Sequence, residues 1–260
     1  MALRDRSELA NAKRVVVKVG SSSISGANES KIELLVDALA KSHGRGVEVI
    51  LVSSGAIATG LPLLGMETKP DDLATSQALA SVGQSRLISR YQQSLERFGI
   101  VAGQVLLTSG DLEAAETREN AKRAMDKLVS LRVLPIVNEN DTVATQEIRF
   151  GDNDRLAALV AVLVEADALI LLSDVDALYD MPPTKAGAKR IDTVKFGEDL
   201  SNVEIGGSST NVGTGGAVTK VSAAKVATES GVAVLLTNTD QVSLALDGAE
   251  VGTWFEAGTN

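Results

Sequence analysis

The chain has 260 residues, 44% of them hydrophobic, and its 25 basic and 34 acidic side chains give a formal net charge of −9. This acidic balance argues against a protein that binds nucleic acid or anionic membranes, and with only 3% aromatic residues there are few side chains on which bases could stack. The chain has no cysteine, which excludes disulfides, thiol nucleophiles and thiolate metal sites. We therefore expect a soluble cytoplasmic protein that binds neither nucleic acid nor a membrane.

Apolar runs typical of buried strands alternate with segments whose apolar residues recur at helical spacing. The runs predict strands at 14–19, 47–52, 105–107, 134–137, 168–172, 232–236 and 251–255. The spacing predicts helices at 30–42, 71–98 (as one helix or two), 111–131, 156–164 and 217–230. Continuous apolar strands that alternate with helices are typical of a parallel sheet covered on both faces. The expected fold is α/β, a three-layer αβα sandwich with a central, mainly parallel sheet in one domain, 1–260.

Polar side chains follow several of the predicted strands directly. The clusters are Lys18 with Gly20, residues 53–55, residues 138–141, and Ser173 with Asp174. Because ligand sites in such sheets lie beyond the carboxyl ends of the strands, the clusters predict one site at one edge. Each also has a simpler interpretation: Lys18 could extend to solvent, and a serine at a strand-to-helix turn could cap the helix. The polar residues at 138–141 and 151–154 are equally typical of a surface loop with a helix cap.

A glycine-rich stretch, 213–216, precedes the predicted helix that carries Lys220. Glycines let a backbone approach a phosphate closely, and helix amides attract anions. The stretch matches neither the Walker pattern, since Lys220 follows Thr219, nor the dinucleotide pattern, since Val218 replaces the third glycine. Two lysines from opposite ends of the chain, with an acid between them, favour phosphoryl transfer, which depends on positioning and charge neutralisation.

Seven segments also carry a family resemblance. In chain order they read VVVKVGSS, VSSGAIATG, QALASVGQSRL, IVNENDTVAT, FGDND, LLSDVDALY and GTGGAVTK. They resemble the glutamate 5-kinases of the amino-acid kinase family. The resemblance implies the amino-acid kinase fold, with an amino-acid-binding lobe at about 1–165, a nucleotide-binding lobe at about 166–260 and no C-terminal RNA-binding-like domain. It also implies transfer of the ATP γ-phosphate to the side chain of L-glutamate, the first step of proline biosynthesis.

The resemblance implies roles for individual residues. Lys18 would contact the ATP phosphates, Lys220 would stabilise the phosphoryl group in transfer, and Asp154 would hold both lysines. Glutamate would bind to Ser54, Gly55, Asp141 and Asn153, with Asp141 taking the α-amino group, and Ser54 and Asn153 suiting the carboxylates. The nucleotide would contact Lys18, Ser173, Asp174, Thr214, Gly215, Gly216, Ala217, Val218, Thr219 and Lys220. Ala217 and Ser173 depart mildly from the family pattern, which usually has methionine and threonine there.

Other expectations concern partners and alternatives. ATP would bring Mg²⁺, and the protein itself would have no metal site. Proline would act as a feedback inhibitor. The chain would form a homo-oligomer. A kinase for another acid, such as N-acetylglutamate, and a non-catalytic ligand-binding protein are the alternatives. We treat Gln84 in the helical region as solvated or interfacial. We also expect Asp154→Ala to leave the fold nearly intact and to lower turnover by orders of magnitude.

Overall fold

The computed structural model describes residues 3–144, 153–200, 203 and 216–258. Its strands are β1 (Arg14–Val19), β2 (Glu48–Ser53), β3 (Ala102–Leu107), β4 (Leu134–Glu139), β5 (Ala168–Ser173), β6 (Leu178–Tyr179), β7 (Arg190–Ile191), β8 (Thr193–Val194), β9 (Ala233–Asn238) and β10 (Thr253–Phe255). Its α-helices are α1 (Lys31–Gly44), α2 (Ala56–Leu63), α3 (Leu73–Glu96), α4 (Ser109–Glu113), α5 (Ala115–Ser130), α7 (Asn153–Leu163), α8 (Ala217–Glu229) and α9 (Val242–Leu246). Short 3-10 turns are Arg6–Asn11, Ser21–Ser23, Gly26–Asn28 and Thr239–Gln241.

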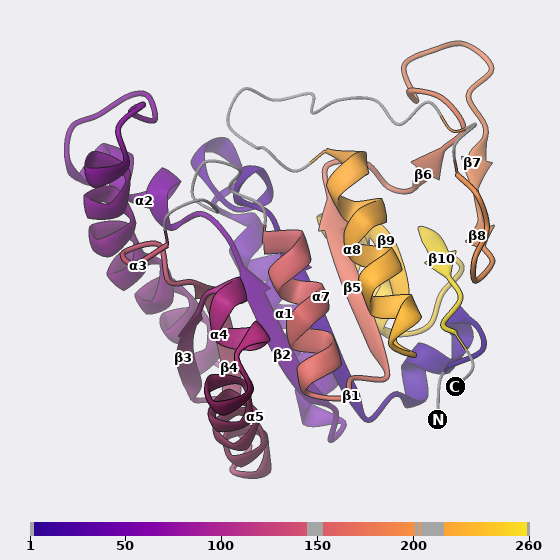
Figure 1. The fold of residues 1–260 in the computed structure, drawn as a ribbon, viewed down its shortest axis with the longest axis horizontal. Coiled ribbons are helices and arrows are strands. Elements are labelled where there is room, and N and C mark those ends of the chain that lie inside the picture. Colours follow the sequence, from indigo (N-terminus) through magenta and orange to yellow (C-terminus); the bar gives the residue numbers. More distant parts are fainter. Residues whose placement is uncertain (1–2, 145–152, 201–202, 204–215, 259–260) are drawn as a thin grey trace.

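The described strands form an eight-stranded sheet in the order β3-β4-β2-β1-β5-β9-β10-β8, and β6 and β7 form a separate hairpin (Figure 1). Every neighbouring pair in the large sheet is parallel except β9 and β10, which are antiparallel. The predicted α/β class with a mainly parallel sheet is thus confirmed. The order reverses at β1, since the chain extends the sheet from there through β2 on one side and through β5 on the other. Such a reversal opens a crevice at the carboxyl end of the strand, where ligands bind in open α/β sheets.

The layers follow from the alternation of side chains along the strands. Val15 and Val17 belong to one apolar core, which includes residues of α1, α3 and α9, whereas Val16 belongs to a second core with residues of α5, α7 and α8. Figure 1 shows α7 and α8 side by side across one face of the sheet. Because successive side chains of a strand point to opposite faces, Lys18 faces the same side as Val16, toward α7 and α8.

The predicted strands and helices are confirmed, apart from shifts of one to three residues at most ends. The region 71–98 contains one continuous helix, α3. The region 111–131 instead divides into α4 and α5, because the backbone of Ala114 is extended, with φ −78° and ψ 125°. The hairpin β6-β7, β8 and the one-turn α9 were not predicted, because elements of two to five residues are too short to show a periodicity. Of α2, only the strand-to-helix turn before it was predicted. No helix in the described part of the chain combines the length and the apolar character needed to cross a bilayer.

Candidate active site

Lys18, Asp154 and Lys220 form a buried charged cluster at the carboxyl end of β1. Asp154, in the first turn of α7, is fully buried; its Oδ1 pairs with Lys18 Nζ, and its Oδ2 lies 3.0 Å from Lys220 Nζ of α8. The two lysines are 3% and 5% exposed. The solvent-facing interpretation of Lys18 is therefore wrong. Two cations share one carboxylate, so these three side chains carry one net positive charge in a buried place, which favours binding of an anion there.

Ser53 and Ser54 lie at the turn between β2 and α2. The N-cap position of α2 is occupied by Gly55, which has φ +104° and no side-chain capping bond, so the helix-cap interpretation of Ser54 is wrong. Ser53 Oγ instead lies 2.9 Å from the hydroxyl of buried Tyr91 in α3 and donates to the Ser54 carbonyl at 3.1 Å. Ser54 Oγ is buried and has no hydrogen-bond partner among the described residues. A buried hydroxyl in this state is available to a ligand.

The turn at Ser54 and Gly55 is positioned by close packing of the two helices that follow it. A Cβ atom added at Gly83 of α3 would lie 1.8 Å from the carbonyl oxygen of Ala56, and one added at Gly60 of α2 would lie 2.1 Å from the carbonyl oxygen of Leu79. Only glycine allows backbones to approach this closely. The start of α2 is therefore held directly against α3.

Asn153 begins α7 beside Asp154 and is 6% exposed. Its Nδ2 donates to the Ser53 carbonyl oxygen at 2.6 Å and to Asn138 Oδ1 at 2.7 Å. Asn138 Nδ2 in turn donates to Gln84 Oε1 of α3 at 2.7 Å. Gln84, treated from sequence as solvated or interfacial, is half-buried and bonded to Asn138, and it was given no role in the site. Asn138 belongs to the cluster at 138–141 that predicted the site from its position at a strand end, but no contact was expected for it.

Asp141 follows β4 and lines a cavity of about 180 Å³ with residues of α3 and β3, among them Gln84 and Gln104. Burial raises the pKa of Asp141 to about 6, and the positive charge of Lys69 only partly offsets this effect. A carboxylate that ionises with difficulty gains from a cationic partner, because the partner stabilises its charged form. The position suits the amino group of a substrate.

The residues expected at the nucleotide lie at β5 and at the start of α8. Ser173 Oγ donates to Asp174 Oδ1 at 3.1 Å. Gly216 precedes α8, Ala217 is partly buried, and Val218 is 56% exposed. Thr219 Oγ1 lies 2.9 Å from the Gly216 carbonyl oxygen and 3.0 Å from Asp154 Oδ2, so its hydroxyl contacts the charged cluster. Thr214 and Gly215 lie outside the described residues.

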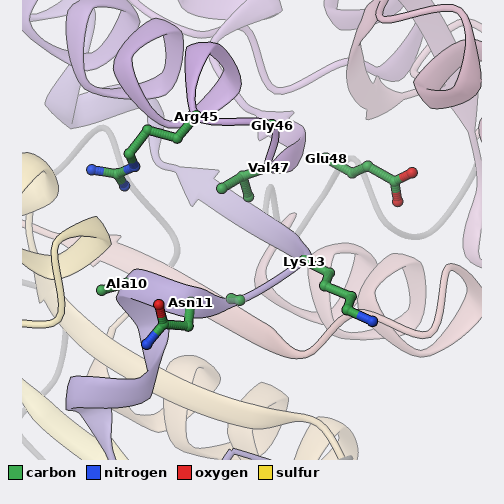
Figure 2. A pocket seen from close by; sticks show the side chains of 8 residues that line it. Ala10, Asn11, Lys13, Arg45, Gly46, Val47 and Glu48 are labelled. Atoms are coloured by element: carbon green, nitrogen blue, oxygen red, sulfur yellow. The ribbon is translucent and has the colours of Figure 1, made fainter.

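A second hollow lies at the opposite edge of the sheet. Its lining residues are 10–13, directly before β1, and 45–48, which lead into the first residue of β2; Figure 2 shows Lys13 and Arg45 extending away from each other across it. Since Lys18 lies at the carboxyl end of β1, this hollow is separate from the candidate site. Across the described ranges, no group of three or more His, Cys, Asp or Glu side chains is placed to hold a metal ion.

Two solved structures share the fold. A carbamate kinase from Giardia lamblia bound to AMP-PNP superimposes with a TM-score of 0.66, covering 96% of this chain and 100% of that one, at 17% identity. An isopentenyl phosphate kinase gives a TM-score of 0.64 over 93% of this chain and 99% of that one, also at 17% identity. At such low identity these matches establish the architecture alone.

Sequence relatives are much more similar. The chain is 67% identical over 255 residues to the glutamate 5-kinase of Clavibacter sepedonicus, with 98% of both chains covered, and 64% identical over 256 residues to that of Leifsonia xyli, with 98% and 95% covered. It is 52% identical to the glutamate 5-kinase of Streptomyces coelicolor, covering 97% of this chain and 69% of that longer one. Residues 13–238 match the model of the amino acid kinase family. On these matches and this fold, the chain belongs to the amino acid kinase family and, within it, to the glutamate 5-kinases.

Proposed function

We propose that the protein transfers the γ-phosphoryl group of ATP to the side-chain carboxylate of L-glutamate, which gives γ-glutamyl phosphate and ADP in the first step of proline biosynthesis. The observation that carries this proposal is the buried cluster in which Asp154 bridges Lys18 and Lys220. A carboxylate and a triphosphate repel each other, and a buried site with net positive charge offsets that repulsion. The 67% identity to a glutamate 5-kinase supports glutamate as the acceptor.

The chemistry needs no covalent intermediate on the protein. An oxygen of the substrate carboxylate attacks the γ-phosphorus, the bond from this phosphorus to the bridging oxygen breaks, and ADP leaves with the electron pair. Lys18 and Lys220 neutralise charge on the phosphoryl oxygens in transfer, and Asp154 keeps the two ammonium groups at fixed places. Positions fixed before the reaction need no reorganisation during it.

Each of the other residues expected in the site binds one of two ligands, glutamate or ATP. Asp141 and Asn153 with the Ser54–Gly55 turn bind glutamate in the part of the chain before about residue 165, and Ser173, Asp174 and the start of α8 bind ATP in the part after it. Mg²⁺ arrives on the nucleotide, where it offsets triphosphate charge. We include inhibition by proline and assembly into a homo-oligomer in the proposal.

An assay of ADP release tests the acceptor. We expect turnover with L-glutamate, little with N-acetylglutamate, and γ-glutamyl hydroxamate when hydroxylamine is present. Asp141 is the basis of this preference, because a free ammonium gains from a carboxylate partner and an acetylated nitrogen does not. Turnover with N-acetylglutamate alone would overturn the proposed acceptor, and turnover with neither acid would favour a non-catalytic protein. The same assay with added proline, and light scattering of the purified protein, test the other two parts.

A further inference from the structure

Two successive hydrogen bonds join α3 to the turn that follows β2. They begin at Tyr91, which is fully buried and whose hydroxyl oxygen lies 2.9 Å from Ser53 Oγ. Ser53 Oγ in turn lies 3.1 Å from the Ser54 carbonyl oxygen, which can only accept a hydrogen bond. Ser53 therefore uses its single proton on this carbonyl, and Tyr91 is the donor to Ser53.

The opposite direction would leave a buried donor without an acceptor. If Ser53 donated to Tyr91, the proton of the tyrosine hydroxyl would have no acceptor among the described residues, although Tyr91 is 0% exposed. Burial also raises the pKa of this hydroxyl far above its usual value, so the hydroxyl keeps the proton that it donates. We call Tyr91, Ser53 and the Ser54 carbonyl the hydroxyl relay.

The hydroxyl relay fixes the peptide group between Ser54 and Gly55. This peptide is trans, and the C=O and N–H of a trans peptide point in opposite directions. A carbonyl held toward Ser53 therefore directs the Gly55 N–H away from Ser53. Neither this N–H nor Ser54 Oγ donates to any described residue. The turn thus offers two donors to a ligand, and a carboxylate is the acceptor that gains most from them.

This turn lies beside the charged cluster, on the loop that follows β1. A Cβ atom added at Gly55 would lie 3.6 Å from Ser21 Cβ, and one added at Gly20 would lie 3.9 Å from Lys18 Nζ. The turn and the lysine are therefore separated by one short loop at the same edge of the sheet. A carboxylate bound at the turn would lie close to the place where the phosphoryl group is transferred.

We infer that Tyr91 and Ser53 are positioning residues for glutamate, which hold the Ser54 carbonyl and thereby orient the Gly55 N–H toward a substrate carboxylate. The inference rests on the proposed function. Both side chains are 0% exposed, so they act through the turn and do not touch the substrate. Their effect should appear in the binding of glutamate alone, because the residues expected at ATP lie at the end of β5 and at the start of α8.

Tyr91→Phe removes one oxygen atom from the hydroxyl relay and keeps the packed ring. We expect the KM of L-glutamate at saturating ATP to rise about fivefold, the effect of one neutral hydrogen bond, and the KM of ATP to change by less than about twofold. Ser53→Ala breaks the relay at its next atom and should have the same effect. The double variant should be no worse than either single variant, whereas independent effects would multiply to about 25-fold.

Ser42→Ala is the matched control for a buried serine. Ser42 is 1% exposed and accepts a hydrogen bond from Arg45 Nη2 at 3.1 Å, but it lies near the end of α1, close to the start of β2 rather than to its end. Its melting temperature should fall as in Ser53→Ala, while the KM of glutamate should stay at the wild-type value.

Three results would overturn the positioning role and leave the proposed function intact. They are a lower melting temperature in Tyr91→Phe and Ser53→Ala with an unchanged KM of glutamate, an equal rise in the KM values of glutamate and ATP, and multiplied effects in the double variant. A wild-type protein that forms no γ-glutamyl phosphate would instead overturn the proposed function.

Discussion

Asp154 serves both the fold and the reaction, because a fully buried carboxylate between two buried ammonium groups cannot be removed without leaving like charges together. Asp154→Ala should lower the free energy of unfolding by about 3–5 kcal/mol as well as abolish turnover. The burial thus revises the expectation, made from sequence, of a nearly intact fold. Asp154→Asn keeps the volume and an oxygen acceptor, and its kcat should fall at least about 100-fold.

Urea unfolding and steady-state kinetics measure the two effects separately. Asp240→Asn is the matched control, since Asp240 pairs with Lys31 at 2.9 Å on the surface, where such a pair contributes only about 0–1 kcal/mol. We expect this control to retain wild-type kcat. Substantial turnover in Asp154→Asn would show that the catalytic centre lies elsewhere.

The raised pKa of Asp141 predicts a pH dependence of substrate affinity. Burial raises this pKa to about 6, and only the ionised carboxylate attracts the ammonium of glutamate. As the pH falls from 7 to 5, the KM for glutamate should rise, by about tenfold per pH unit below the pKa, while the KM for ATP changes little. The measurement is a pH series of both constants. Asp141→Asn should show a high KM for glutamate without this inflection.

The raised pKa of Asp141 also makes the stability of the fold depend on pH, and here low pH is favourable, whereas it weakens the binding of glutamate. The folded-state pKa of Asp141 lies above the value of 3.8 for an unperturbed aspartate, so the folded protein takes up the proton first as the pH falls. The stabilising contribution is complete below about pH 3.8 and is lost as the pH rises through about 6. In the wild-type protein this group should therefore lower the free energy of unfolding as the pH rises from about 3.8 to about 6. Asp141→Asn should remove that fall, which urea unfolding at a series of pH values would measure.

Among the elements, the contact between α2 and α3 predicts the clearest structural effect. A methyl group at Gly83 would lie 1.8 Å from the Ala56 carbonyl oxygen, so Gly83→Ala must move the helices apart. We expect a loss of about 1–3 kcal/mol in the free energy of unfolding, as overpacking usually gives. The KM for glutamate should rise too, since α2 begins directly after Ser54 and Gly55.

Gly44→Ala provides the control for that substitution. Gly44 is the last residue of α1, and a Cβ atom there would meet no other atom within 4 Å. Because alanine has the higher helix propensity, this change should be neutral or stabilise by up to about 1 kcal/mol. Thermal unfolding and the KM for glutamate give the comparison. Equal melting temperatures for the two variants would contradict the proposed close packing.

Features that neighbouring residues specify could be predicted from the sequence, whereas features that depend on contacts between distant segments could not. Strands such as β1 and β5 are continuous apolar runs, and the polar residues that follow them, including Lys18 and Ser173, could be placed by the rule for parallel sheets. Gln84 could not be placed in this way. Its contact with Asn138, 54 residues away, depends on how α3 is rotated against β4, which helical periodicity alone does not determine. The break between α4 and α5 depends on the extended backbone of Ala114, and an alanine residue gives no sequence signal for that conformation.

On the scale of the whole molecule, the two edges of the sheet have different roles. At the amino edge Asp167 accepts hydrogen bonds from the backbone N–H groups of Lys13 and Arg14 at 2.7 and 3.0 Å, which ties the start of β5 to that of β1. Arg14 pairs with Glu48 and Asp126 beside it. These contacts lie at the edge opposite Lys18, so we expect them to stabilise the fold and to take no part in the reaction.

Asp167→Ala should therefore separate stability from activity. Loss of a charged acceptor for two backbone donors should lower the free energy of unfolding by about 1.5–3 kcal/mol. The kcat should stay near the wild-type value, because Lys18 lies at the other end of β1. Asp167→Asn, which keeps an oxygen acceptor, should lose less stability. Denaturant unfolding together with the ADP-release assay decides the matter, and a parallel fall in kcat would contradict this division between the edges.

The charged cluster also constrains how the chain reaches its native state. Lys18 comes from the first strand, Asp154 from α7, and Lys220 from a helix 66 residues later, so the cluster has no local precursor during synthesis or refolding. Contacts between segments so distant in sequence form late, after loop closure. An intermediate that buried either lysine before Asp154 arrived would hold an unpaired charge, which discourages premature docking. Activity therefore requires completed folding, because a partly folded chain lacks the assembled cluster that acts on ATP.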